Sequence, residues 1–394
     1  MPNGKFNTAY LAPTSGEPVG LNVLRADGIY LYDLQKKRYI DLISGISVNN
    51  LGHQNPEIIK AIEKQIHEYL HVMAYGEYHQ RPQHNLAKRL SELLPETLNC
   101  SYLVNSGSEA VEGALKLARR YTGKKKIIAM RNAYHGSTFG AMSVMGSNKF
   151  TQAFSPLLPN VEFIDFNNAE ELHKIDQDTA CVIIEPVQGE AGAIPADRDY
   201  LEKLRDSCTQ NECLLIFDEV QTGMGRTGSL FAFEGYGIAP DILVLAKAFG
   251  GGMPLGAFIS SQAIMKSLAS DPILGHITTF GGHPVSCAAA LANLEEILKQ
   301  NVIDKVAEKG AIFRERLVHD SIKGISGKGL LLALHFETNE FAKTVIKNCR
   351  ENGLLTDWFL FAENCLRISP PLIITDSEIE TSCSIILKSI EEAL

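Results

Sequence analysis

The 394-residue sequence lacks several features that would assign it to a specialised class of protein. No block of Lys or Arg stands out against a formal net charge of −9 at pH 7, which argues against nucleic acid as a partner. No stretch reaches about 18 uninterrupted apolar residues, so no membrane span is expected. The first ten residues contain no apolar secretory core, and we therefore expect a cytoplasmic protein.

Paired cysteine motifs are also missing. Eight cysteines are present, but no two have the C-x-x-C spacing, and several lie in apolar runs such as TACVIIEPV, where they act as small core residues. In a chain of this length, that usage indicates a reducing compartment. The composition is 45% hydrophobic and 21% charged, which is typical of a globular protein with a sizeable core.

Apolar runs alternate with helical patterns through the middle of the chain. KKIIAM, ACVIIEPV, CLLIFDEV and DILVLAKAF are nearly continuous in apolar residues, as strands buried on both faces are. SEAVEGALKLARRY and DYLEKLRDSCTQ have the spacing of helices between such strands. The pattern predicts an α/β fold of the doubly wound type. After Pro284, a helix at about 285–300 and short strands such as KGLLLALHF predict a smaller α+β domain.

An H-E-x-x-H motif occurs at 67–71. On a helix, His67 and His71 would share one face as zinc ligands, with Glu68 as the general base of a metallopeptidase. Motifs of this length also arise by chance, no G-x-x-H follows at metzincin spacing, and no clear third ligand is evident. A zinc metallopeptidase is kept as a distant alternative.

A G-x-G-x-x-G match occurs at 223–228, directly after the predicted strand CLLIFDEV. A dinucleotide fingerprint should open into a helix, but SLFAFEGYGIAPD does not read as one. We interpret these glycines as a loop beside an active site. No Walker A pattern is present.

Two charged side chains stand at the ends of predicted buried strands. CLLIFDEV ends near Asp218 and DILVLAK ends at Lys247. Open α/β sheets bind ligands at the carboxyl ends of their strands, and a buried lysine is costly unless it is paired or neutral. Together the two residues fit a lysine that forms a Schiff base with pyridoxal phosphate and a carboxylate that faces the pyridine nitrogen. A buried Lys–Asp ion pair is the alternative that the pattern leaves open.

A phosphate site is predicted at Ser106, Gly107 and Ser108, just before the helix EAVEGALKLARR. Free N–H groups and the positive end of the helix dipole would meet an anion there. An ordinary N-cap is the alternative.

The chain resembles the class III aminotransferases of fold type I, the group that contains acetylornithine, ornithine and 4-aminobutyrate aminotransferases. The likeness runs from about Gly28 to Pro371 and includes LVNSGSEAVEGALKLARR, AYHGSTFG, VIIEPVQGEAG, LLIFDEVQTGMGRTG, PDILVLAKAFGGGMPLGA and LRISPPL. It implies a large domain at 51–284 with a mostly parallel, seven-stranded type of sheet. It also implies a smaller α+β domain at 285–394, to which an N-terminal segment at 1–50 contributes.

The resemblance implies a role for each residue that matches a family motif. Lys247 would form the Schiff base with pyridoxal 5'-phosphate, and Asp218 would keep the ring nitrogen protonated. Thr279 would reach the phosphate from a partner subunit, which implies a homodimer with shared active sites. The other expected contacts are Gln221 to the phenolic oxygen, Val220 and Tyr134 on the two ring faces, Ser106, Gly107 and Ser108 to the phosphate, and Thr278 to the substrate.

Glu190 and Arg367 occupy the positions of a Glu–Arg switch in family members that pair an ω-amine with glutamate. Paired, they would mask the positive charge, and released, Arg367 would take a carboxylate of 2-oxoglutarate bidentately. A ping-pong transfer from an ω-amine donor to 2-oxoglutarate follows, with no metal. A structural arginine is the alternative for Arg367.

Ser137 departs from the family pattern, because AYHG is usually followed by an Arg that clamps the distal carboxylate of the donor. Loss of such a charged hydrogen bond is worth about 1.5–3 kcal/mol. PTSGEPVG also lacks the tyrosine that ornithine enzymes use beside that arginine, and His283 replaces the usual Asn. An acetylornithine- or ornithine-like donor and a place in arginine biosynthesis are expected. A 4-aminobutyrate, diamine or β-amino acid aminotransferase, an aminomutase and a non-catalytic cofactor-binding protein remain alternatives.

Overall fold

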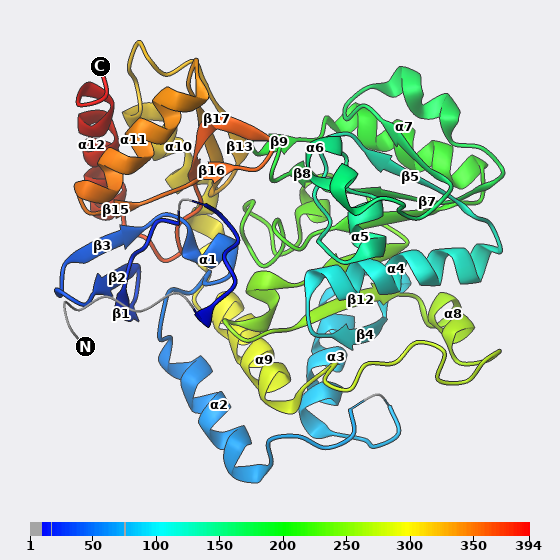
Figure 1. Ribbon diagram of the computed structural model, residues 1–394. Coiled ribbons are helices and arrows are strands. Elements are labelled where there is room, and N and C mark those ends of the chain that lie inside the picture. Colours follow the sequence, from blue (N-terminus) through cyan, green and yellow to red (C-terminus); the bar gives the residue numbers. More distant parts are fainter. Residues whose placement is uncertain (1–9, 17, 75) are drawn as a thin grey trace.

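The computed structural model describes residues 10–16, 18–74 and 76–394 (Figure 1). Residues 1–9 and 17 of the predicted N-terminal segment at 1–50 therefore lie outside the described residues. Among the described residues, no helix is both long enough and apolar enough to cross a bilayer.

A seven-stranded sheet forms the centre of the described structure. β12 is antiparallel to both of its neighbours, and the other pairings are parallel, so the predicted mostly parallel sheet is confirmed. The strand order is β4 (Cys100–Val104), β12 (Gly256–Ser260), β11 (Ile242–Leu245), β10 (Leu214–Asp218), β7 (Thr179–Ile184), β5 (Lys126–Met130) and β6 (Val161–Ile164).

Helices cover both faces of this sheet because successive side chains of a buried strand point to opposite sides. In β10, Leu214 and Ile216 pack in the same cluster as α4, whereas Leu215 and Phe217 pack in the cluster that contains α7. Figure 1 shows α4 and α7 on either side of the strands. The long helices of this part are α2 (Pro56–Glu68), α3 (Arg81–Leu93), α4 (Gly107–Thr122), α7 (Arg198–Gln210) and α9 (Pro284–Lys299).

A second sheet lies in the C-terminal part, with three helices packed against it (Figure 1). Its order is β13 (Gly324–Lys328), β14 (Leu331–His335), β17 (Ala362–Ile368) and β16 (Trp358–Phe359). The helices are α10 (Val306–Arg316), α11 (Asn339–Glu351) and α12 (Asp376–Glu391). In α11 the buried residues Ala342, Val345, Ile346 and Cys349 recur at helical spacing and face this core.

The N-terminal strands pair with a strand from near the other end of the chain. The sheet order is β1 (Val23–Asp27), β2 (Tyr30–Asp33), β3 (Arg38–Asp41) and β15 (Leu354–Leu355). Short elements complete the described chain: α1 (Ser44–Ser47), α5 (Phe139–Ser143), α6 (Asn148–Thr151), α8 (Gln262–Met265), β8 (Val187–Gln188) and β9 (Ile194–Pro195).

The helix α9 packs against α2 and α3, and its buried residues belong to the core of the large sheet. The division of the chain at residues 50 and 284 stays a prediction, and the packing of α9 favours a second boundary after this helix.

Candidate active site

A cavity of about 370 Å³ lies at the carboxyl ends of β7, β10 and β11. Nine of the residues that the sequence analysis selected line this cavity, although they come from five separate parts of the chain. They are Ser106, Gly107, Ser108, Tyr134, Glu190, Asp218, Val220, Gln221 and Lys247. These residues lie close together because the parallel strands that precede several of them end at the same edge of the sheet.

Lys247 stands two residues after β11 in a left-handed backbone conformation, with φ at 51°. That conformation costs a residue with a side chain on the order of 1–3 kcal/mol and is typical of functional sites. Removal from water lowers the pKa of Lys247, against the opposing pull of the Glu190 carboxylate, and Arg367 lowers it further. Burial therefore favours a neutral amine facing the cavity.

Gln221 joins Lys247 to Arg367. Its amide oxygen accepts from Nζ of Lys247 and from Nη1 of Arg367, both at 3.3 Å, in the orientation that these two donors require.

Asp218 is the last residue of β10 and is held by two donors. Nδ1 of His135 lies 2.7 Å from Oδ2 of Asp218, and the backbone N–H of Val220 donates to Oδ1 at 3.0 Å. Because a carboxylate accepts, Nδ1 of His135 carries the proton. Sequence reasoning missed His135, although AYHG was among the motifs that it quoted.

Glu185 is a second residue that sequence reasoning missed, and it also lines the cavity. Its carboxylate accepts from the backbone N–H of Tyr134 at 3.0 Å and from that of Gly189 at 2.9 Å. Burial raises the pKa of Glu185 to about 7, and the nearby Asp218 charge adds to the rise. Glu185 thus fixes the backbone of the aromatic residue beside the cavity.

The N-terminus of the 16-residue helix α4 opens into this cavity. Ser106 is its N-cap, and its hydroxyl accepts from the N–H of Glu109 at 3.2 Å. A Cβ placed on Gly107 would lie 3.1 Å from both methyl groups of Val220, so the glycine allows a close approach of backbone to this side chain. Free N–H groups of the first turn suit an anion such as phosphate.

These residues fit pyridoxal phosphate. The cavity combines a withdrawn amine at Lys247, a buried carboxylate at Asp218 suited to a cationic ring nitrogen, and a helix N-terminus suited to a phosphate. Tyr134 and Val220 line the same cavity and supply apolar surface for a flat ring.

Ser137 is exposed beside the cavity, and its hydroxyl lies 3.1 Å from Oη of Tyr134. Its backbone N–H donates to Oγ of Ser108 at 3.2 Å. Among the described residues that line the cavity, Lys247 has the only Lys or Arg side chain, so no guanidinium stands where the resemblance predicted a clamp.

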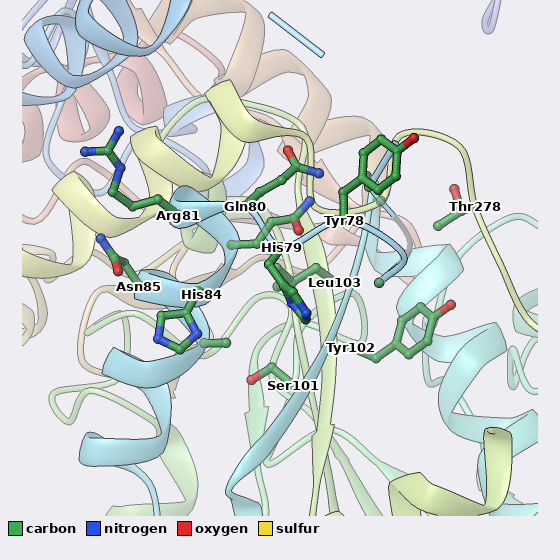
Figure 2. A pocket seen from close by; sticks show the side chains of 15 residues that line it. Tyr78, His79, Gln80, Arg81, His84, Asn85, Ser101, Tyr102, Leu103 and Thr278 are labelled. Atoms are coloured by element: carbon green, nitrogen blue, oxygen red, sulfur yellow. The ribbon is translucent and has the colours of Figure 1, made fainter. Parts of the chain in front are cut away.

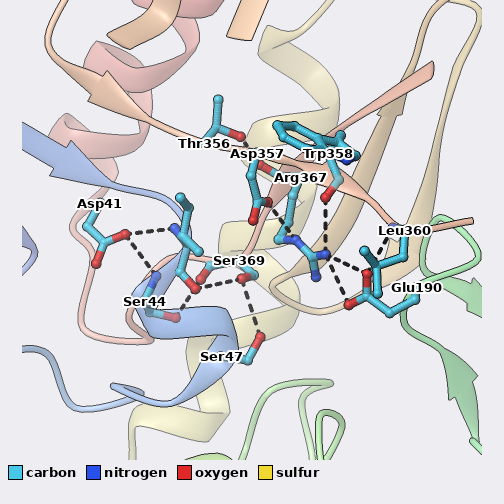
Figure 3. A network of polar contacts seen from close by, with 11 residues as sticks. Asp41, Ser44, Ser47, Glu190, Thr356, Asp357, Trp358, Leu360, Arg367 and Ser369 are labelled. Carbon is cyan, nitrogen blue, oxygen red and sulfur yellow. Dashed lines mark hydrogen bonds and ion pairs between the residues drawn. The ribbon is translucent and has the colours of Figure 1, made fainter. Parts of the chain in front are cut away.

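Arg367, on β17, is 2% exposed and bound by two carboxylates (Figure 3). Its Nη2 donates to both oxygens of Glu190, each at 3.0 Å, and its Nε donates to Oδ1 of Asp357 at 2.7 Å. Burial would raise the pKa of Glu190, but the charges of Arg367 and Lys247 more than offset it and the net pKa is lowered. The predicted Glu190–Arg367 pair is formed, and sequence reasoning missed Asp357.

Thr278 and Thr279 do not line the cofactor cavity in the described residues of their own chain. Thr278 instead lines a different cavity of about 810 Å³, across from Tyr78 and Tyr102 (Figure 2). Its Oγ1 accepts from Nδ2 of Asn105 at 2.9 Å, and Asn105 lines the cofactor cavity. The two cavities are therefore neighbours.

The H-E-x-x-H motif does not form the arrangement that a zinc site requires. Helix α2 ends at Glu68 and Tyr69 is extended, so the expectation that His67 and His71 share a helix face is wrong. The ring of His71 instead stacks on His283, with centroids 5.5 Å apart. In the described part of the chain, no group of three or more His, Cys, Asp or Glu residues is placed to hold a metal ion.

Comparisons with known proteins agree with this geometry. A family model described as Aminotransferase class-III matches residues 10–390. The acetylornithine aminotransferase of Archaeoglobus fulgidus is 41% identical over 364 residues, which are 92% of this chain and 94% of that protein. The [LysW]-aminoadipate semialdehyde/glutamate semialdehyde transaminase of Sulfolobus acidocaldarius is 37% identical, over 93% and 94% of the two chains.

Solved structures show the same fold. An ornithine aminotransferase from Toxoplasma gondii, with partial occupancy of pyridoxal phosphate at its active site, matches with a TM-score of 0.91 at 30% identity. The match covers 98% of this chain and 92% of that chain.

Proposed function

The chain belongs to the class-III aminotransferase family, and we propose that it transfers the amino group of an ω-amine donor to 2-oxoglutarate by a ping-pong mechanism. It is an aminotransferase with the fold type I architecture, and its cofactor is pyridoxal phosphate. The observation that carries the proposal is the convergence of Lys247, Asp218 and Gln221 on one cavity at the edge of the sheet.

Pyridoxal phosphate supplies an electron sink for the carbon that bears the amino group. Lys247 would carry the cofactor and then, as a neutral amine, move a proton at the reacting carbon. Asp218 would keep the ring nitrogen protonated, because a neighbouring negative charge favours the cationic form. His135 would hold Asp218 in place, and the N-terminal turn of α4 would bind the phosphate.

Glu190 and Arg367 would let one cavity serve both half-reactions. In the pair described above, Glu190 covers the guanidinium, which suits a donor that has no carboxylate at that point. Withdrawal of Glu190 would free Nη2 of Arg367 from its carboxylate partner, so that a carboxylate of the oxo acid could take its place. The formation of this pair supports transamination over a mutase, which needs no glutamate half-reaction.

We also propose a homodimer with shared active sites. Tyr78 lines the 810 Å³ cavity and is 56% exposed, and Phe280, next to the lining residue Gly281, is 54% exposed. Large exposed apolar side chains in one region mark interaction surfaces. Thr279 lies outside the cofactor cavity of its own chain, as a residue that serves a partner should. Light scattering of the purified protein tests this, and a monomer that is fully active contradicts it.

The experiment that tests the function uses the holoenzyme with ω-amine donors and 2-oxoglutarate. Initial velocities at several donor concentrations should give parallel double-reciprocal lines. Borohydride reduction should fix the cofactor to one peptide, identified by mass spectrometry as the one containing Lys247. Lys247→Ala should abolish both results, whereas Lys266→Ala, at an exposed lysine, should change neither. Attachment at another lysine would contradict the proposal.

A further inference from the structure

The guanidinium of Arg367 lies between the carboxylates of Glu190 and Asp357 (Figure 3). Glu190 lines the cofactor cavity, whereas Asp357 lines a separate cavity of about 860 Å³ together with Thr356 and Trp358. Arg367 itself is buried, and the Asp357 side chain is 25% exposed. The guanidinium is thus paired with two carboxylates, although a switch requires only one carboxylate that can withdraw.

The two carboxylates differ in how they are attached to Arg367. Asp357 lies on the same hairpin as Arg367, and the backbone N–H of Arg367 donates to the Asp357 carbonyl at 2.8 Å. The ring of Phe359, from the same hairpin, lies 4.1 Å from Cζ of Arg367. Glu190 comes from the loop after β8. Besides the guanidinium, the one donor to its carboxylate among the described residues is the N–H of Leu360, at 3.1 Å. Asp357 therefore stays on Nε when Glu190 withdraws.

The second carboxylate lowers the charge of the site in both states. With Glu190 in place, one guanidinium and two carboxylates carry a net charge of −1. With Glu190 withdrawn, Arg367 and Asp357 together are neutral, where a free guanidinium would be positive. Electrostatics therefore disfavour a carboxylate on the donor and weaken the hold on the oxo acid.

The residues that line the cofactor cavity also favour a positively charged group over a negatively charged one. The carboxylates of Glu190 and Asp218 line it, and Lys247 supplies the only lysine or arginine among its described lining residues. Ser137, at the rim beside Tyr134, is neutral. A donor whose far end carries a positive charge finds complementary charge here, and a donor with a carboxylate does not.

We infer that Asp357 is a positioning residue that directs donor preference toward diamines, in which the end away from the reacting amine carries an ammonium group. It acts through Arg367, by fixing Nε and reducing the net charge that substrates meet. The inference rests on the proposed function and names the donor class that the same site selects.

The test compares wild-type holoenzyme with Asp357→Asn, which keeps the side-chain shape and removes its charge. The donors are 1,4-diaminobutane and N-acetylornithine, with 2-oxoglutarate as acceptor. The wild type should have the higher kcat/KM for the diamine. Asp357→Asn should lower the diamine-to-acetylornithine ratio about tenfold, which corresponds to about 1.4 kcal/mol, and should lower the KM for 2-oxoglutarate.

Glu363→Gln is the matched control, because Glu363 lies on the same hairpin but pairs with Lys149 and Lys343 instead of Arg367. It should leave the donor ratio unchanged. If Asp357→Asn lowers kcat equally with every donor, Asp357 has only a structural role and the inference fails. A wild type that prefers N-acetylornithine also overturns it, whether or not the variant folds. A wild type that transaminates no donor would overturn the proposed function itself.

Discussion

Nδ1 of His135 lies 2.7 Å from Oδ2 of Asp218, and both side chains are almost fully buried. The contact joins the loop after β5 to the end of β10, across the β7 strand that lies between them in the sheet. A buried hydrogen bond to a charged acceptor holds the acceptor side chain in one orientation and stabilises its ionised form.

Replacement of His135 by Phe should therefore impair catalysis without preventing the cofactor from binding. Loss of one charge-assisted hydrogen bond is worth about 1.5–3 kcal/mol, so kcat should fall about 10- to 100-fold. His135→Asn, which keeps a donor, should recover part of the loss. Steady-state kinetics at saturating cofactor measure this. His173→Phe, at an exposed histidine, is the control, and equal loss in the Asn and Phe variants would contradict the role.

Replacement of Ser137 by Arg should make N-acetylornithine a better donor. Ser137 sits at the rim of the cavity next to Tyr134, where a guanidinium can meet a carboxylate of the donor. A charged hydrogen bond of about 1.5–3 kcal/mol predicts a rise in kcat/KM of about 10- to 100-fold. Ser384→Arg, on the exposed face of α12, changes the net charge equally and should have no effect. No improvement over wild type would show that position 137 does not face the donor.

Glu185 should make the stability of the folded chain without cofactor depend on pH. Its pKa is raised from 4.5 to about 7 by burial, so between these values the folded chain holds a proton that the unfolded chain has released. Stability from this group is therefore greatest at low pH and falls as pH rises through the window, by on the order of 3 kcal/mol.

Glu185→Gln should remove this part of the slope, although it also costs stability at every pH, because an amide cannot accept from both backbone N–H groups. Thermal melts between about pH 5 and pH 8 give the slope. Glu202→Gln, on the exposed side of α7, should keep the wild-type slope. Parallel pH profiles for wild type and Glu185→Gln would contradict the assignment.

Arg226 should be essential for stability. It is fully buried and donates to the carbonyls of Leu330 and Pro370 and to Oδ1 of Asn50, so it ties three segments together. Arg226→Ala leaves these buried acceptors without a donor, at about 1–3 kcal/mol each, and should cost about 3–5 kcal/mol in all. Arg316→Ala removes an exposed ion pair with Glu380 and should cost at most about 1 kcal/mol. Chemical denaturation compares the two, and similar losses would contradict the prediction.

The sequence was sufficient to predict the location of those residues that stand at the ends of buried strands. Asp218 and Lys247 each follow a continuous apolar run, and parallel strands bring such ends to one edge. His135, Glu185 and Asp357 were missed because their roles depend on partners 83, 51 and 10 residues away, whose contact only the folded chain defines. Local spacing carries no signal for such pairs.

Helix ends were the least predictable feature. Isoleucines recur at helical spacing through α2 up to Ile66, and neither Gly nor Pro marks the end of the helix. In the structure, Tyr69 leaves the helical conformation, and Nε2 of Gln65 donates to its carbonyl at 3.0 Å. This side chain satisfies a terminal carbonyl that the helix leaves open. A five-letter motif that spans such an end loses the geometry on which its function depends.

The hairpin of β16 and β17 carries Arg367, its partner Asp357 and the Leu360 backbone N–H that donates to Glu190. In the proposed function, about a dozen consecutive residues would hold most of the groups that bind the far end of the substrate, separate from the strand ends that carry Asp218 and Lys247. Substitutions confined to this hairpin could therefore change which amines the enzyme accepts and leave the cofactor site unchanged.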